Sequence, residues 1–96
     1  MSASVHADKE RLATMLAAHA ATAGMYIRVH GDHLILGRTE EGQPEDRVRL
    51  TKLASHRYGL SVKRHTGRWQ RTPFSGNLQE VMNAITGFMQ HLVAPC

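Results

Sequence analysis

The segment His30-Gly31-Asp32-His33 places two imidazoles and a carboxylate around one expected turn. Neutral imidazoles and carboxylates are common zinc ligands, and a closed zinc site needs four of them. No cysteine and no second histidine pair has ligand spacing in this chain. We therefore expect neither a bound metal nor another cofactor, because the Gly31-Asp32 step is already explained as a hairpin turn.

Candidate catalytic residues lack the partners that catalysis needs. His19 lies on the apolar side of an expected helix, and the sequence identifies neither a cleft nor an orienting partner for it. The serines stand outside any Gly-x-Ser-x-Gly motif, and no glycine-rich phosphate loop is present. The sequence therefore predicts a protein that is not an enzyme. A small enzyme with a histidine-lined cleft is the alternative.

Basic residues form the most informative pattern. From Arg47 to Gln79 the chain has eight lysines and arginines and no aspartate or glutamate. Polar and apolar residues alternate in Arg47-Val48-Arg49-Leu50 and in 60–63, which is the period of a half-buried strand. The pattern predicts positive charge on one face of a sheet.

We expect a binding surface on the sheet face that points away from the helices, here called the open face. Its predicted members are Arg28, His30, His33, Arg47, Arg49, Lys63, His65 and Arg68. Recognition of a protein partner is the favoured function. Weak, non-specific nucleic-acid binding is the alternative, because lysine and arginine attract phosphates. Proteins that bind single strands also use aromatic side chains, and only Tyr26 is expected on this face.

Length and composition predict one small globular domain. The chain has 96 residues, 42% hydrophobic residues and a formal charge of +4. The only cysteine is Cys96, so no intramolecular disulfide can form, which fits a reducing compartment. No stretch is long and apolar enough to cross a membrane. We expect a cytoplasmic protein whose first few residues are disordered, and the oligomeric state stays open.

The elements that must position these residues begin with a helix from Ala7 to Thr22, ended by Gly24. A hairpin follows, with strands over 25–30 and 33–38 and a two-residue turn between them. That turn sets the register, so that Val29 lies opposite Leu34 and Ile27 lies opposite Leu36. The facing apolar pairs place the core on one side of the hairpin.

Three more strands are predicted after a polar loop that contains Gly42 and Pro44. They span about 47–52, 58–65 and 68–72. We expect Thr66-Gly67 to form a two-residue turn. That turn would place Trp69 opposite Arg64, on the core face.

The last helix has the clearest signals. Asn77 and Glu80 have the spacing of a capping box. An apolar stripe follows, made of Leu78, Val81, Met82, Ile85, Phe88, Met89 and Leu92. The predicted fold is α+β with two layers: a helix, an antiparallel β-meander of about five strands, and a helix, with both helices on one sheet face.

Overall fold

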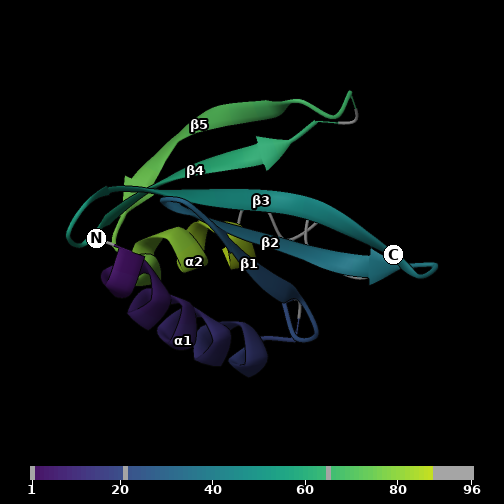
Figure 1. Ribbon diagram of the computed structural model, residues 1–96, viewed down its shortest axis with the longest axis horizontal. Coiled ribbons are helices and arrows are strands. Elements are labelled where there is room, and N and C mark those ends of the chain that lie inside the picture. The colour runs from purple at the N-terminus through teal and green to yellow at the C-terminus, as the bar shows by residue number, and fades with distance from the viewer. Residues whose placement is uncertain (1, 21, 65, 88–96) are drawn as a thin grey trace.

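The chain folds into a helix, a five-stranded antiparallel meander and a second helix (Figure 1). The computed structural model describes residues 2–20, 22–64 and 66–87, with side chains from residue 7 onward. Strands that follow one another in the chain are neighbours in the sheet. The predicted α+β class and the meander are confirmed. The elements are α1 (Ser2–Ala18), β1 (Tyr26–His30), β2 (His33–Glu40), β3 (Gln43–Ala54), β4 (Arg57–Lys63), β5 (Trp69–Gly76) and α2 (Leu78–Gly87).

The hairpin of β1 and β2 closes at Gly31 and Asp32, as predicted. Gly31 has a φ of 59°, which fits the first central position of a type II′ turn. Ile27 pairs with Leu36, and Val29 pairs with Leu34, so the predicted register is confirmed.

The acidic segment after β2 is a hairpin and not the predicted polar loop. β2 continues to Glu40 and β3 begins at Gln43. Glu41 has a φ of 53° and Gly42 a φ of 79°, and a type I′ turn requires positive φ at both central residues. The prediction was wrong because these strand ends have no apolar face, so the alternation that indicates a strand is missing.

A β-bulge interrupts the pairing of β2 with β3. Leu36 pairs with Val48, but the next residue, Gly37, pairs with Asp46. Arg47 is therefore the extra residue. A bulge breaks the strict alternation of side chains between the two sheet faces. Residues of β3 before the bulge consequently lie on the opposite face from the one that simple alternation assigns.

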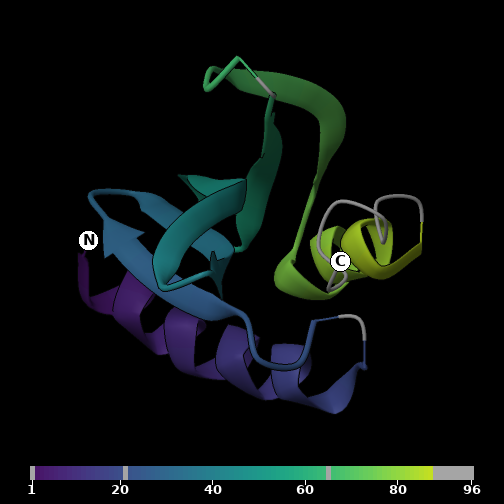
Figure 2. The ribbon, with the colours of Figure 1, turned by 90° about the vertical axis from the view of Figure 1, so that its right-hand side faces the viewer.

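Both helices pack against the same face of the sheet, which curls around α2 (Figure 2). Leu12 and Leu16 of α1 and Val81 and Ile85 of α2 are buried in one cluster. Their sheet neighbours occupy alternate strand positions, so one apolar face supplies the core. These neighbours, none more than 1% exposed, are Leu34, Leu36, Val48, Leu50 and Leu60.

α1 differs from the predicted helix at both ends. It begins at Ser2, so the segment that was expected to be disordered is helical from Ser2 onward. It ends at Ala18 and not at Thr22. The Thr22 side chain is buried, and its hydroxyl donates to the Leu16 carbonyl at 2.8 Å, which satisfies a carbonyl of the last turn. His19 lies beyond the helix end and is exposed.

The capping box of α2 is present in both directions. The Asn77 amide donates to Glu80 Oε1 at 2.9 Å, and the Glu80 amide donates to Asn77 Oδ1 at 2.8 Å. Four residues of the predicted stripe are buried: Leu78, Val81, Met82 and Ile85. Its other members, Phe88, Met89 and Leu92, lie outside the described residues.

Asp8 ties α1 to the sheet. Its Oδ2 accepts a hydrogen bond from the Tyr58 hydroxyl at 2.7 Å and one from Lys52 Nζ at 3.1 Å. Burial alone raises the pKa of Asp8, but the hydrogen bonds from Tyr58 and Lys52 lower it by more. The net pKa lies below the usual aspartate value, so the carboxylate stays ionised at neutral pH.

Replacing Asp8 by asparagine is expected to lower the free energy of unfolding at pH 7 by about 1 to 3 kcal/mol, because Lys52 loses its anionic partner. The pKa of Asp8 is lower in the folded protein than in the unfolded chain, where it is about 3.9. The Asp8 carboxylate therefore stabilises the fold at pH values above about 3.9, and this stabilisation is lost as the pH falls through the folded-state pKa. Urea melts of Asp8→Asn and wild type should therefore converge between pH 7 and pH 2. The exposed control Glu10→Gln should stay within about 0.5 kcal/mol of wild type. An Asp8→Asn difference that persists at pH 2 would contradict the role of the carboxylate.

Candidate binding face of the sheet

One row of side chains crosses all five strands of the open face. The strand pairing aligns Arg28, Ile35, Arg49, Ser61 and Arg71, in that order. Adjacent strands are about 4.8 Å apart, so arginines on every second strand stand roughly 10 Å apart. Between them, Ile35 is only 4% exposed and Ser61 only 3% exposed. The centre of the open face is therefore packed, with charged groups above it.

Trp69 also lies on this face, next to two of its cations. It pairs with Lys63 across β4 and β5. The Arg49 guanidinium carbon is 4.9 Å from the centroid of the indole ring, and Lys63 Nζ is 5.8 Å from it. Both distances are within the range of cation-π interactions. The open face thus has an aromatic ring flanked by positive charge.

The prediction that Trp69 faces the core, opposite Arg64, is wrong. The Arg64 amide donates to the Arg68 carbonyl at 2.8 Å, so three residues and not two separate the paired positions. The Gly67 amide donates to the Arg64 carbonyl at 2.8 Å, and Gly67 has a φ of 88°. These features define a three-residue loop with a glycine bulge. A shift of one residue moves every later side chain of β5 to the other face.

Three cations of the open face have no carboxylate at ion-pair distance within the described part of the chain: Arg49, Lys63 and Arg71. Among the same residues, the buried Nε of Arg49 has no hydrogen-bond partner. The guanidinium of Arg49 is held by the ring of Trp69 and not by an acid. A ligand with several negative charges would therefore meet positive charge that is not held in ion pairs.

Arg28 differs from these three cations because Asp46 neutralises it. Arg28 Nη2 donates to Asp46 Oδ2 at 2.7 Å, and the Tyr26 hydroxyl donates to Asp46 Oδ1 at 2.6 Å. Burial raises the pKa of Asp46, but the hydrogen bonds from Tyr26 and Arg28 outweigh it and lower the net pKa. Burial and the same carboxylate raise the pKa of Tyr26. Asp46 therefore stays ionised and the Tyr26 hydroxyl stays protonated.

His30 and His33 lie at the turn end of the open face. Their rings are stacked, with centroids 6.5 Å apart, and His33 Nδ1 lies 2.9 Å from Thr51 Oγ1. Burial, followed by the charge of Arg49, lowers the pKa of His33, so it is neutral at pH 7. The residues that the structure describes contain no group of three or more His, Cys, Asp or Glu placed to hold a metal ion. Independence from metal stays a prediction.

Two of the other predicted members, Arg47 and Arg68, lie off this face. Arg47 is the bulged residue of β3 and forms an ion pair with Glu40. Arg68 precedes Trp69 in the chain, so alternation turns it to the side away from the indole. His65 lies outside the described residues. Five of the eight predicted residues share the open face: Arg28, His30, His33, Arg49 and Lys63. The loop shift that misplaced Trp69 also hid Arg71.

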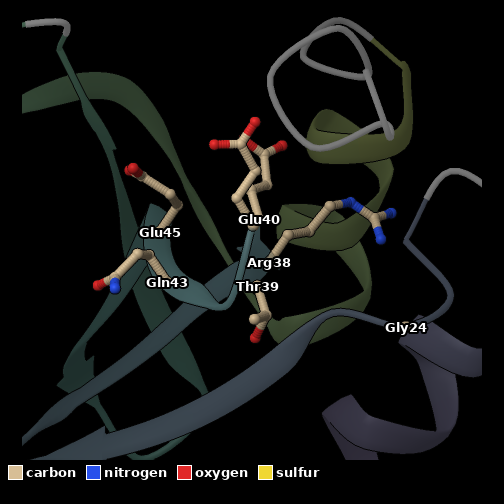
Figure 3. Close-up of a pocket in the computed structure, with 7 residues that line it drawn as sticks. Gly24, Arg38, Thr39, Glu40, Gln43 and Glu45 are labelled. Carbon is tan, nitrogen blue, oxygen red and sulfur yellow. The ribbon is translucent and has the colours of Figure 1, made fainter.

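A hollow of about 750 Å³ lies between the end of the β2–β3 hairpin and the segment after α1 (Figure 3). Arg38 is 9% exposed and reaches toward Gly24, where its Nη1 donates to the Ala23 carbonyl at 3.1 Å. Glu40 and Glu45 also line the hollow. Arg38 fastens the hairpin to the helix layer, and the carboxylates make the hollow unsuited to an anion.

Comparisons with models of known protein families, with curated proteins and with solved structures find no match to this chain. No helix in the described ranges is long and apolar enough to cross a membrane.

Proposed function

We propose that the open face binds single-stranded nucleic acid with little sequence preference. The observation that supports this most directly is the position of Trp69 next to Arg49 and Lys63. Proteins that bind single strands combine aromatic rings for stacking with cations that follow the backbone. Arg71, two residues from Trp69 along β5, extends the positive charge.

Each group has a distinct role in this proposal. A base stacks on the indole of Trp69 by displacing a cation that lies over the ring, in a contact worth about 1 to 3 kcal/mol per base. Arg49, Lys63 and Arg71 contact phosphates, which position a strand without reading its sequence. The Asp46 carboxylate on this face already accepts hydrogen bonds from Arg28 and Tyr26, so it adds no base contact. A duplex is disfavoured because its bases are already stacked on one another.

The corrected position of Trp69 is the reason to prefer nucleic acid over protein as the partner of this face. From the sequence, protein recognition was favoured because only Tyr26 was expected there. With Trp69 beside two cations, the missing aromatic group is supplied. In this proposal the protein is a non-enzymatic binding module that meets nucleic acid in the cytoplasm.

Titration with oligonucleotides tests the proposal directly, because Trp69 is the only tryptophan of the chain. Stacking of a base should quench its fluorescence. With three phosphate contacts, log affinity should fall with log salt with a slope of about −2, or roughly fifteenfold between 50 and 200 mM. Unrelated single strands should bind with similar affinity, and a duplex of the same sequence more weakly.

Variants separate stacking from charge. Trp69→Ala should weaken binding of a labelled oligonucleotide about tenfold or more, whereas Trp69→Phe keeps an aromatic ring and should bind within a few fold of wild type. Arg49→Gln should reduce the salt slope by about 0.7. Arg11→Gln removes the same charge from α1, on the other side of the sheet, and is the matched control. Equal binding by Trp69→Ala and wild type, or no binding at 50 mM salt, would overturn the proposal.

A further inference from the structure

A second surface lies along β1, which is an edge strand of the sheet and runs beside α1 (Figure 1). Two hollows of about 580 and 230 Å³ meet there, and Lys9 and Ile27 line both of them. Val29 lines the first hollow, and Ala13 and Ala17 of α1 line the second. Together they form one groove between the edge of β1 and the helix.

The backbone of β1 offers hydrogen bonds to this groove. His30 and His33 flank a two-residue turn, so they exchange hydrogen bonds with each other, and alternate residues of β1 bond to β2 in the same way. The same alternation requires Asp32 to bond to β3 and not to β1. It does, because the Lys52 amide donates to the Asp32 carbonyl at 2.9 Å. The amide and carbonyl groups of Ile27 and Val29 therefore point outward. No described strand pairs with them.

The side chains around the groove specify what fits. Ile27 and Val29 are half-buried and turn toward the helix layer, while Ala13 and Ala17 are exposed and small. The floor of the groove is therefore apolar, and the larger hollow also has Tyr26 and the Arg28–Asp46 ion pair on its lining. Lys9 stands where the two hollows meet and has no carboxylate partner among the residues described.

We infer that this groove binds an extended peptide segment that carries an acidic residue, by adding a strand to the edge of β1. The outward groups of Ile27 and Val29 supply the backbone hydrogen bonds, and alternate apolar side chains of the peptide enter the groove. Lys9 pairs with the acidic residue. The five residues of β1 match a peptide of similar length. The groove adjoins the open face at Tyr26, Arg28 and Asp46, but it uses none of the groups proposed to contact nucleic acid, so this inference does not depend on the proposed function.

The probe is a synthetic peptide of alternating valine and threonine that ends in aspartate, with blocked termini. Amide exchange of Ile27 and Val29 is measured with and without it. Saturating peptide should slow exchange at both amides at least tenfold. Two N-methylated forms of the peptide serve as a matched pair. One is methylated at the odd-numbered residues and the other at the even-numbered residues, and only one of these two sets of amides faces β1. One form should lose binding at least tenfold and the other should keep it.

Protein variants test the groove itself. Ala13→Glu adds bulk and charge at an exposed position and should abolish peptide binding. Thr14→Glu adds the same charge to a neighbouring exposed position that does not line the groove, and should bind like wild type. Lys9→Gln should weaken binding of the aspartate peptide but not of an asparagine version. Oligonucleotide affinity should not change in any of these variants.

Three results would overturn this inference. The first is equal binding of both N-methylated peptides. The second is the absence of protection at Ile27 and Val29. The third is protection that rises with protein concentration without peptide, which would show that a second copy of the chain occupies the edge.

Discussion

Replacing Ile85 by alanine is expected to lower the free energy of unfolding by about 2 to 5 kcal/mol. Ile85 of α2 is fully buried in the cluster that joins both helices to the sheet. The truncation removes apolar contacts and leaves a cavity that the close-packed surroundings fill only in part. Urea melts of wild type and variant, followed by Trp69 fluorescence, measure the difference.

Gln79→Ala is the matched control on the same helix. Gln79 is exposed, and its Nε2 donates to Asn83 Oδ1 at 2.9 Å. A side-chain pair of this kind on a helix surface is worth about 0.2 to 0.5 kcal/mol. The control should therefore cost no more than about 0.5 kcal/mol. Equal costs for the two variants would show that α2 does not bury the Ile85 face.

The parts of the fold that the sequence predicts correctly have short-range causes. Gly31-Asp32 defines a turn, and a turn of known length fixes the pairing of Val29 with Leu34. Asn77 and Glu80 begin α2 because each side chain satisfies an amide of the other residue. In both cases the signal lies within a few residues of the structure it determines.

The errors arise where one inserted residue changes a register. At the Arg64 to Arg68 loop, two-residue and three-residue turns both contain Gly67, and local composition does not separate them. At the bulge, Arg47 looks like a regular strand residue until its pairing partners are known. Each insertion reverses which side chains face the core. Alternation in the sequence therefore predicts which sheet face a side chain occupies less well for β3 and β5 than for β1 and β2.

The residues of the candidate site also divide into those predicted correctly and those misplaced by a register shift. The sequence places Arg49 and Lys63 correctly because they alternate with the buried Val48 and the partly buried Val62 in regular strands. Trp69 and Arg71 were missed because they follow the misjudged loop. Positive charge on a sheet face can thus be predicted from the sequence, whereas the combination of charge with an aromatic ring depends on the register of β5.

Replacing Gly37 by alanine is expected to destabilise the protein by about 3 to 5 kcal/mol, which is more than most single changes in a strand. Gly37 pairs with Tyr26 on one side and with Asp46 on the other. A Cβ atom there would overlap the Tyr26 ring and the Glu45 carbonyl oxygen, closer than real Cβ contacts allow. The backbone cannot yield without separating β2 from β3 at the bulge.

The loss has two parts. Overpacking costs about 1 to 3 kcal/mol, and a hydrogen bond to a charged group is worth about 1.5 to 3 kcal/mol. The displaced Tyr26 hydroxyl would no longer donate to Asp46, so the pKa of Asp46 should rise toward its usual value. Urea melts measure the first effect, and NMR titration of the Asp46 carboxyl measures the second.

Gly59→Ala is the control for Gly37→Ala, because Gly59 also lies on the open face of a central strand. A Cβ at Gly59 would meet Leu53 Cδ1 at 3.3 Å, the end of an exposed and flexible side chain. Leu53 can move, so this variant should cost less than about 1 kcal/mol. Similar costs for the two alanine variants would mean that Tyr26 does not lie across Gly37. The hydrogen bond that holds Asp46, and with it the neutralisation of Arg28, would then need another explanation.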